Sequence, residues 1–316
     1  MKAVYTHRLQ RHQHPPNEQY FIGQVTLAVP VKTSPSKILE EYQQHHKVFS
    51  EEQSQQLPSH SIWDHVIELL PGAPNSLPGQ LLPLNLKEKV EIHKFVQEYL
   101  NQGTIHISKS PYAANFFFIK KKDGKLRPVQ DYCPLNKWMK KNKNVSPLIN
   151  QIIDHLSGCS LFTTMDICWG YNNIRIKEGD EWKAAFLTPE GLFKPTVMFF
   201  GLMNSPATFQ TMMNAIFHQE VGEGWLSIYM DDMAIHTARL LHESKEQHVQ
   251  QHRTYVHRVL TKLEENNLYL KPEKCEFEKE EIEYLGVIVG KNHLKMSPKK
   301  LQGIADWPIP KTPTNI

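Results

Sequence analysis

The fold of this chain is decided by the stretch Trp225-Leu-Ser-Ile-Tyr-Met-Asp231-Asp232-Met-Ala-Ile-His236, in which two apolar runs flank two adjacent carboxylates. The pattern predicts strands over 225–230 and 233–236, joined as a hairpin through Asp231 and Asp232. Adjacent carboxylates at the tip of a buried hairpin repel each other and lose hydration, which is costly unless a cation compensates. An exposed turn would hold the pair harmlessly, although hairpin turns prefer Asn-Gly or Asp-Gly. The pair is therefore a candidate metal site, with a plain surface turn as the alternative.

A third carboxylate, Asp166, ends another apolar run, Leu161-Phe-Thr-Thr-Met-Asp166. If this strand is a neighbour of the hairpin in one sheet, Asp166 faces the turn that holds Asp231 and Asp232. Three hard oxygen ligands then converge, and Mg²⁺ prefers such ligands. Two Mg²⁺ ions roughly 4 Å apart are the known arrangement for in-line displacement at phosphorus. Taken in isolation, Asp166 is more simply read as a strand-end residue that caps a turn.

Length and composition exclude several classes of protein. The chain has 316 residues, enough for one large domain or two, with 40% hydrophobic and 22% charged residues. These values exclude collagen-like, coiled-coil and wholly disordered chains, and no apolar run reaches the roughly 20 residues that a membrane span requires. Residues 1–10 lack the apolar run of a secretory signal. The four Cys form no Cys-x-x-Cys pair, so we expect reduced thiols.

Basic charge is concentrated in one block of the sequence. Residues 109–143 hold ten Lys or Arg against two Asp, a net charge of +8, whereas the whole chain carries +3. Such a block suits a partner that bears phosphates. The alternative is a charged hairpin that is merely solvated.

The pattern of apolar residues predicts an α+β fold. Residues 1–85 are rich in Pro and read as an extended arm with one short helix, from Ser36 to about Phe49. Further helices are expected over 86–101, 147–156, 242–266 and from Ser205, which caps its helix. Strands are expected over 115–120, 125–131, 161–166, 174–176, 184–187, 197–200, 225–230, 233–236, 268–270, 284–289 and 294–296. Helices and hairpins interleave without strict alternation, which favours an antiparallel sheet backed by helices.

Six motifs stand in order along the chain after about residue 49. They are Lys120-Lys-Lys-Asp-Gly-Lys-Leu-Arg-Pro128, Phe162-Thr-Thr-Met-Asp-Ile-Cys-Trp-Gly-Tyr171, Phe200-Gly-Leu-Met-Asn-Ser-Pro-Ala-Thr-Phe-Gln210, Tyr229-Met-Asp-Asp232, Lys271-Pro-Glu-Lys-Cys275 and Tyr284-Leu-Gly-Val287. With these motifs the chain resembles the reverse transcriptases of gypsy-type LTR retrotransposons, over about 270 residues. Each motif alone is weak, and their shared order carries the resemblance.

The resemblance implies a right-hand polymerase with a palm and fingers. It divides the chain into an N-terminal arm or linker over 1–85, fingers and the start of the palm over 86–160, and a palm over 161–296. That palm would carry the catalytic carboxylates and the primer grip. Residues 297–316 would be the truncated start of a thumb or connection, so that most of the thumb is missing.

The resemblance also assigns roles to individual residues. Asp166, Asp231 and Asp232 would be the catalytic metal ligands for two Mg²⁺ ions, with Mn²⁺ as a substitute. Lys274 fits the general acid that protonates pyrophosphate, and Lys271 is a near alternative. The expected dNTP-binding residues are Lys121, Arg127, Tyr171, Phe200, Gly201 and Gln210. Tyr171 among them would be the steric gate that excludes a 2′-OH. The expected primer and template contacts are Tyr229, Met230, Leu285 and Gly286.

The implied function is an RNA-directed DNA polymerase that extends a primer with dNTPs on an RNA or DNA template. No RNase H or protease is expected in this chain, so other parts of a retrotransposon polyprotein are expected partners, in cytoplasmic virus-like particles with later nuclear delivery. Cys133 stands where the family usually has Arg. The alternatives are therefore a catalytically silent relic that only binds nucleic acid and, less favoured, a DNA-templated palm polymerase.

Overall fold

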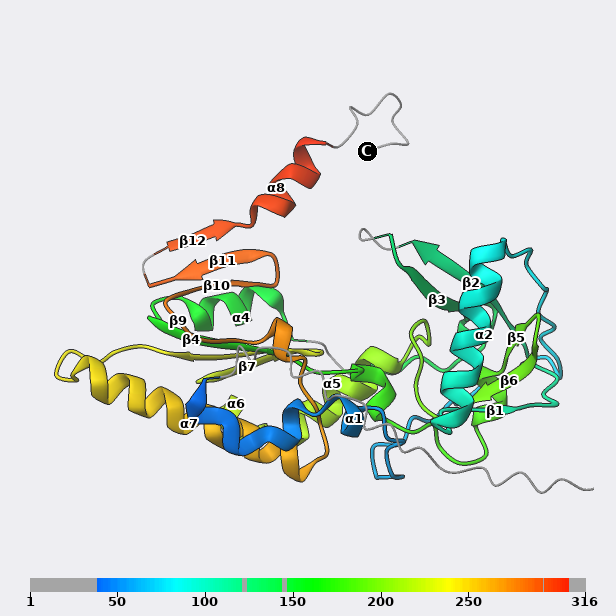
Figure 1. The fold of residues 1–316 in the computed structure, drawn as a ribbon, viewed down its shortest axis with the longest axis horizontal. Coiled ribbons are helices and arrows are strands. Elements are labelled where there is room, and N and C mark those ends of the chain that lie inside the picture. Colours follow the sequence, from blue (N-terminus) through cyan, green and yellow to red (C-terminus); the bar gives the residue numbers. More distant parts are fainter. Residues whose placement is uncertain (1–38, 121–123, 144–146, 292, 307–316) are drawn as a thin grey trace, which may run out of the picture. The chain divides into compact units, whose positions relative to one another are not determined.

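The structure is a computed structural model that describes residues 39–120, 124–143, 147–291 and 293–306. Its elements form an α+β fold in which antiparallel sheets are covered by helices (Figure 1), as the interleaved sequence pattern predicts. The described strands group into sheets of four, five and three. No described helix is long and apolar enough to cross a membrane.

The four-stranded sheet carries the residues that decide the fold. Its order is β7-β8-β4-β9, all antiparallel, with bounds Leu226–Tyr229, Asp232–Thr237, Leu161–Asp166 and Glu276–Lys279. The predicted strand over 161–166 is confirmed, and the predicted hairpin pairs β7 with β8. The edge strand β9 was not predicted from the sequence. Its residues Glu-Phe-Glu-Lys contain a single apolar side chain, which is too few for the alternation of apolar and polar residues that indicates a strand.

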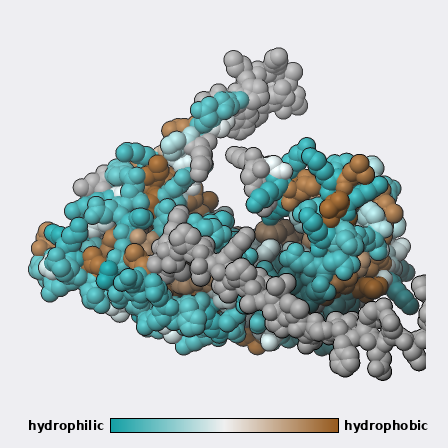
Figure 2. All heavy atoms as spheres, in the orientation of Figure 1, coloured by the Kyte–Doolittle hydropathy of each residue, from teal (hydrophilic) through white to brown (hydrophobic). Residues whose placement is uncertain are grey.

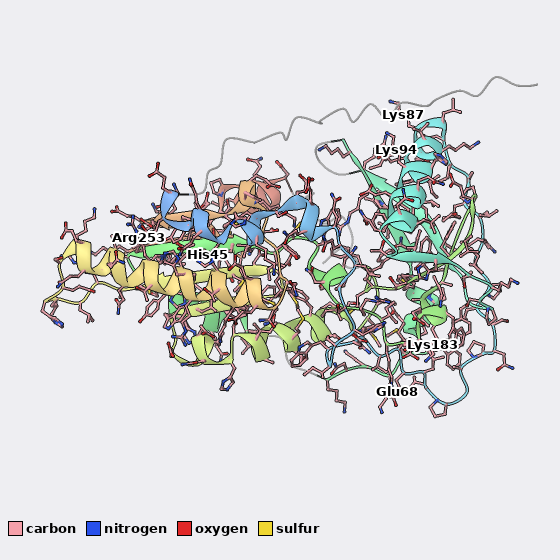
Figure 3. The ribbon with its side chains drawn as sticks, turned by 60° about the horizontal axis from the view of Figure 1, so that its bottom comes forward. His45, Glu68, Lys87, Lys94, Lys183 and Arg253 are labelled. Atoms are coloured by element: carbon pink, nitrogen blue, oxygen red, sulfur yellow. The ribbon has the colours of Figure 1, made fainter. Side chains whose placement is uncertain are left out.

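Helices pack on this sheet through an apolar core. Helix α5 (Ser205–Ile216) contributes Phe209, Met212 and Met213, and α7 (Lys245–Glu265) contributes four buried aliphatic residues. The 3-10 helix η1 (Glu40–Phe49) adds Tyr42 and Val48 to the same cluster. Within the predicted arm, η1 therefore contributes to the core. It runs along α7; Figure 3 labels His45 on η1 and Arg253 on α7.

Helices α5 and α7 start differently from the sequence-based expectation, and α4 (Ile149–Leu156) begins at Ile149 rather than at residue 147. Helix α5 is preceded by Asn204 rather than capped by Ser205, and its N-cap makes no side-chain hydrogen bond. The Asn204 amide is used elsewhere, since it accepts from the Asn142 N–H and donates to the Lys140 carbonyl. Helix α7 starts later than predicted because Ser244 forms a capping box with Gln247.

The five-stranded sheet has the order β1-β6-β5-β2-β3. Its strands are Ile105–Ile107, Gly191–Pro195, Phe186–Thr188, Ala114–Lys120 and Leu126–Asp131, and only β2 and β5 pair in parallel. Helix α2 (Leu86–Asn101) packs on it through Phe95, and has the bounds that its apolar period predicts. Strands β1, β2 and β3 come before residue 160 in the chain, and β5 and β6 come after it. This sheet therefore combines residues from both sides of the expected boundary at residue 160.

Four predicted strands are replaced by other structures. Over 174–176 and 268–270 the backbone makes only isolated bridges, at Arg175, Ile176 and Leu270. Over 197–200 the backbone makes only an isolated bridge, between Arg175 and Val197, before it turns. The expected strand over 284–289 is instead a hairpin of β10 (Glu281–Tyr284) and β11 (Val287–Gly290), which β12 (His293–Met296) extends. Leu285 and Gly286 have φ of 50° and 80°, the pattern of a two-residue type I′ turn that reverses the chain.

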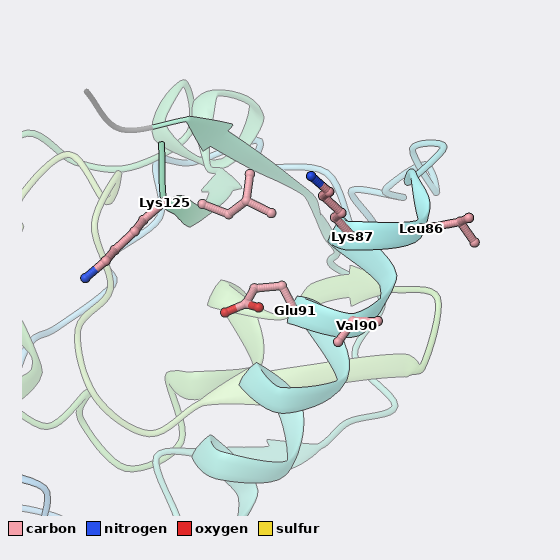
Figure 4. A pocket seen from close by; sticks show the side chains of 6 residues that line it. Leu86, Lys87, Val90, Glu91 and Lys125 are labelled. Carbon is pink, nitrogen blue, oxygen red and sulfur yellow. The ribbon is translucent and has the colours of Figure 1, made fainter. Parts of the chain in front are cut away.

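The remaining described elements are short. They are α1 (Glu51–Ser54), α3 (Cys133–Asn136), α4 (Ile149–Leu156), η2 (Gly170–Asn173), η3 (Glu181–Ala184), α6 (His218–Gly222), η4 (Pro272–Lys274) and α8 (Pro298–Ala305). The face drawn in Figure 2 is mainly hydrophilic, with scattered hydrophobic residues. A hollow of about 660 Å³ lies on α2 and β3 (Figure 4), lined by Leu86, Lys87, Val90, Glu91, Lys125 and Leu126.

Candidate active site

The hairpin between β7 and β8 has a two-residue turn, Met230-Asp231, closed by the pair Tyr229 and Asp232. Met230 has φ of 56°, an uncommon conformation for a residue with a side chain. The turn is held from below by Gln210 of α5, whose Oε1 accepts the Met230 N–H at 2.8 Å. Gln210 is buried, and its amide nitrogen donates to Asn214 at 2.8 Å. The structure thus places Gln210 against the turn, while its predicted contact with a nucleotide stays a prediction.

The antiparallel register brings the three carboxylate residues to one end of the sheet. Asp166, the last residue of β4, pairs directly with Asp232, the first residue of β8. The Ile167 N–H donates to the Asp231 carbonyl at 3.0 Å, which ties the end of β4 to the turn. The strand that ends in Asp166 and the hairpin that holds Asp231 and Asp232 are therefore neighbours in one sheet, as the convergence of the three carboxylates requires.

Two lysines neutralise Asp166, which is buried at 9% exposure. Lys271 Nζ donates to Oδ1 and Lys274 Nζ donates to Oδ2, each at 2.7 Å. Burial lowers the pKa of Lys274, but the hydrogen bond and the negative charge of Asp166 outweigh it, so that this pKa lies above its usual value. Lys271, the near alternative in the sequence, contacts the same carboxylate.

Negative charge is crowded at this end of the sheet. Burial, together with the charges of Asp231 and Asp166, raises the pKa of Asp232 to about 6. A divalent cation would relieve this repulsion, and the three carboxylates are the hard ligands that Mg²⁺ takes. Among the described residues, no three His, Cys, Asp or Glu side chains are placed to hold an ion as they stand. The carboxylate oxygens are of the kind that Mg²⁺ prefers. In this structure both oxygens of Asp166 accept hydrogen bonds from lysines.

Aromatic side chains lie between the carboxylates and strand β3, which belongs to the basic block over 109–143. The Tyr171 ring packs on Phe209 and on Phe200, with centroids 5.8 and 4.9 Å apart. The guanidinium of Arg127, from β3, lies 4.4 Å from the Phe200 centroid, within the range of a cation–π contact. Burial and the charge of Asp231 raise the pKa of Tyr171. The structure therefore brings together three of the predicted dNTP-binding residues; Lys121 lies outside the described residues.

Gly201 occupies a place that strongly favours glycine. Its φ is 99°, and a Cβ there would lie 3.2 Å from the Gln130 carbonyl oxygen. Its own carbonyl accepts from the Asn136 amide at 2.8 Å. Backbone therefore approaches closely at Gly201, at the end of β3, while the predicted contact of Gly201 with a nucleotide stays a prediction.

The predicted primer-grip residues are linked to the carboxylates by a tyrosine that sequence reasoning did not single out. Leu285 and Gly286 form the turn after β10, and the Tyr284 hydroxyl donates to the Asp232 carbonyl at 2.9 Å. Burial raises the pKa of Tyr284, which keeps the hydroxyl protonated as a donor. The only sequence signal was its place at the start of the Tyr-Leu-Gly-Val motif.

Sequence reasoning also missed three buried histidines on α7 and β8. His248 and His252 lie one turn apart on α7, and both contact the Thr237 hydroxyl, at 2.9 and 3.0 Å. His236 of β8 contacts the Ser227 hydroxyl at 3.0 Å. The available signal was the spacing of His248 and His252 on the apolar stripe of α7.

Comparison with known proteins finds a family model and relatives that match this chain. The family model described as reverse transcriptase (RNA-dependent DNA polymerase) matches residues 119–289, a little over half of the chain. The chain is 34% identical over 235 residues to the Transposon Tf2-3 and Tf2-7 polyproteins of Schizosaccharomyces pombe. These matches cover 74% of this chain, which spans only 17% of the length of those relatives.

Solved structures share the fold. A foamy viral protease-reverse transcriptase in complex with double-stranded DNA superposes with a TM-score of 0.74 at 21% identity, over 89% of this chain and 48% of the other. A second, in complex with an RNA/DNA hybrid, gives a TM-score of 0.72 at 20% identity, over 89% of this chain and 37% of the other. At such identities the likeness concerns the fold.

Proposed function

The chain belongs to the reverse transcriptase (RNA-dependent DNA polymerase) family, and from this premise we propose that it performs RNA-directed DNA synthesis. The reaction transfers a nucleotidyl group from a dNTP to a primer 3′-OH on an RNA or DNA template. The observation that carries the proposal is the register of β4 with β8, which pairs Asp166 with Asp232 beside Asp231. The motif order and the Tf2 relatives support an origin in a gypsy-type LTR retrotransposon polyprotein.

In this proposal Asp166, Asp231 and Asp232 hold two Mg²⁺ ions, or Mn²⁺ in their place. When bound, the ions would lower the pKa of the attacking hydroxyl and neutralise charge on the phosphoryl group. The primer 3′-oxygen forms a bond to the α-phosphorus while the bond to the β-phosphate oxygen breaks. The ammonium of Lys274, which is hydrogen-bonded to Asp166, would give its proton to the leaving pyrophosphate.

The nucleotide is placed by residues outside the carboxylate cluster. Arg127 and Lys121 grip the triphosphate, and a guanidinium suits phosphate oxygens because it presents a planar fork of donors. Tyr171 excludes a 2′-OH by its position between Phe200 and Phe209. Gly201 and Gln210 shape the floor beneath the base, Gln210 by bracing the turn at Met230.

The proposed partners follow from the same chemistry. Tyr229, Met230, Leu285 and Gly286 contact the primer and template, and other parts of a retrotransposon polyprotein act beside this chain. The proposed locations are cytoplasmic virus-like particles and then the nucleus. The proposed division keeps 1–85 as the arm or linker, 86–160 as fingers and the start of the palm, 161–296 as the palm, and 297–316 as the start of a thumb or connection.

Primer extension tests this proposal. The template is poly(rA)–oligo(dT) with dTTP and Mg²⁺, and the parent is run beside Asp231→Asn and Asp154→Asn, an exposed carboxylate on α4. We expect extension by the parent and by Asp154→Asn, and none by Asp231→Asn. If a folded parent binds the primer–template but does not extend it, the silent relic is the correct reading.

A further inference from the structure

We propose that Lys271 and Lys274 are built-in counter-cations of Asp166, so that a divalent metal binds this carboxylate by exchange with a lysine ammonium. We also propose that Lys271 sets the metal affinity of the site. This inference rests on the proposed function, because it takes Asp166 as a metal ligand.

The geometry of Asp166 leads to an exchange. Its Oδ1 accepts from Lys271 Nζ and its Oδ2 accepts from Lys274 Nζ, both at 2.7 Å, so that each oxygen already has a cationic partner. The carboxyl is buried, which restricts rotation toward a new partner. A metal ion that takes one of these oxygens must therefore displace or share the ammonium that holds it.

The two lysines are held with unequal firmness. The Lys271 backbone N–H donates to the Asp166 carbonyl at 3.0 Å, and its Nζ also donates to the Ile167 carbonyl at 3.3 Å. Its side chain is 28% exposed, whereas that of Lys274 is 53% exposed. Water replaces the partner of an exposed ammonium more easily. Lys274 therefore leaves Asp166 first and becomes available to the leaving pyrophosphate, while Lys271 stays beside the carboxylate.

The charges predict effects of opposite sign on two measurements. Three carboxylates with both lysines leave one net negative charge, and loss of the Lys271 charge doubles it. Divalent cations should then bind more tightly, because a competing positive charge is gone. The metal-free fold should become less stable, because the carboxylates repel each other without their counter-cation. A purely structural lysine would not tighten metal binding when replaced.

The test is Mn²⁺ binding to the full chain without nucleotide or nucleic acid, followed by the electron paramagnetic resonance signal of free Mn²⁺. We expect Lys271→Gln to bind Mn²⁺ more tightly by about threefold or more, and Lys271→Arg to match the parent. Lys183→Gln is the matched control. Lys183 of η3 is ion-paired with Asp180 at 2.6 Å, away from the three carboxylates, so this variant should leave the Mn²⁺ affinity unchanged. In EDTA, the midpoint temperature of thermal unfolding should be lower for Lys271→Gln than for the parent. Added Mn²⁺ should restore it.

The outcomes separate this inference from the proposed function. If Asp166→Asn loses Mn²⁺ binding but Lys271→Gln does not tighten it, the exchange is wrong and the metal site stands. If Asp166→Asn binds Mn²⁺ like the parent, both fail. Should Lys271→Gln not fold, Lys274→Gln carries the test: it should tighten binding by a smaller factor, and an unchanged affinity overturns the exchange.

Discussion

Replacement of His252 by Gln should flatten the pH dependence of folding stability. His252 is fully buried, with Nε2 2.8 Å from the Thr163 hydroxyl and Nδ1 3.0 Å from that of Thr237. Burial, aided by the neighbouring His248 and His236, lowers the pKa of His252 to about 3. The unfolded chain has an ordinary histidine pKa of about 6.5. Only the unfolded state therefore takes up a proton between these values.

The magnitude follows from proton linkage. The contribution of a neutral buried His252 is fully present above pH 6.5 and is lost as the pH falls toward the folded pKa of about 3. For each extra proton that the unfolded state binds, the free energy of unfolding falls by about 1.4 kcal/mol per pH unit. One such histidine therefore lowers the free energy of unfolding by about 2 kcal/mol between pH 7 and pH 5. Burial lowers the pKa of His236 to about 4, and His236 adds a similar loss that the replacement leaves in place.

Urea unfolding followed by circular dichroism at pH 7, 6 and 5 measures this difference. The parent should lose about 2 kcal/mol more than His252→Gln between pH 7 and pH 5, whatever the two stabilities are at pH 7. His218→Gln, at an exposed position on α6, should behave like the parent. A loss in His252→Gln as steep as in the parent would refute the reasoning.

Three further predictions concern the candidate site. Tyr171→Ala should raise the ratio of ribonucleotide to deoxyribonucleotide incorporation about tenfold or more, which is about 1.4 kcal/mol, in single-nucleotide extension; unchanged selectivity would contradict the gate. Gln210→Ala leaves the Met230 N–H without its acceptor and should cost about 1–3 kcal/mol in urea unfolding, so an unchanged midpoint would contradict the brace. Gly286→Ala places a Cβ at φ of 80° and should cost about 1–2 kcal/mol in urea unfolding, whereas Gly303→Ala, inside helix α8 with open space around it, should stabilise by about 0.5–1 kcal/mol.

Local patterns in the sequence were sufficient for the elements with a regular period. The apolar spacing over 86–101 gave the bounds of α2, and the run over 161–166 gave those of β4. The sequence pattern was insufficient where a two-residue turn changed the direction of the chain or where a strand was mostly polar. Leu285 and Gly286 split one expected strand into a hairpin, and β9 carries too few apolar residues to be recognised.

The sequence by itself determined the α+β class, the motif order and the three carboxylates, because these depend on residue type and on short-range spacing. Only the tertiary structure decided how the carboxylates meet, since the register that pairs Asp166 with Asp232 joins residues far apart in the chain. It also decided which cations face them: both lysines of the Lys271–Cys275 motif reach Asp166, which spacing alone left open. Which residues meet across such distances along the chain depends on how the elements pack in three dimensions, and the local spacing of residues does not specify that packing.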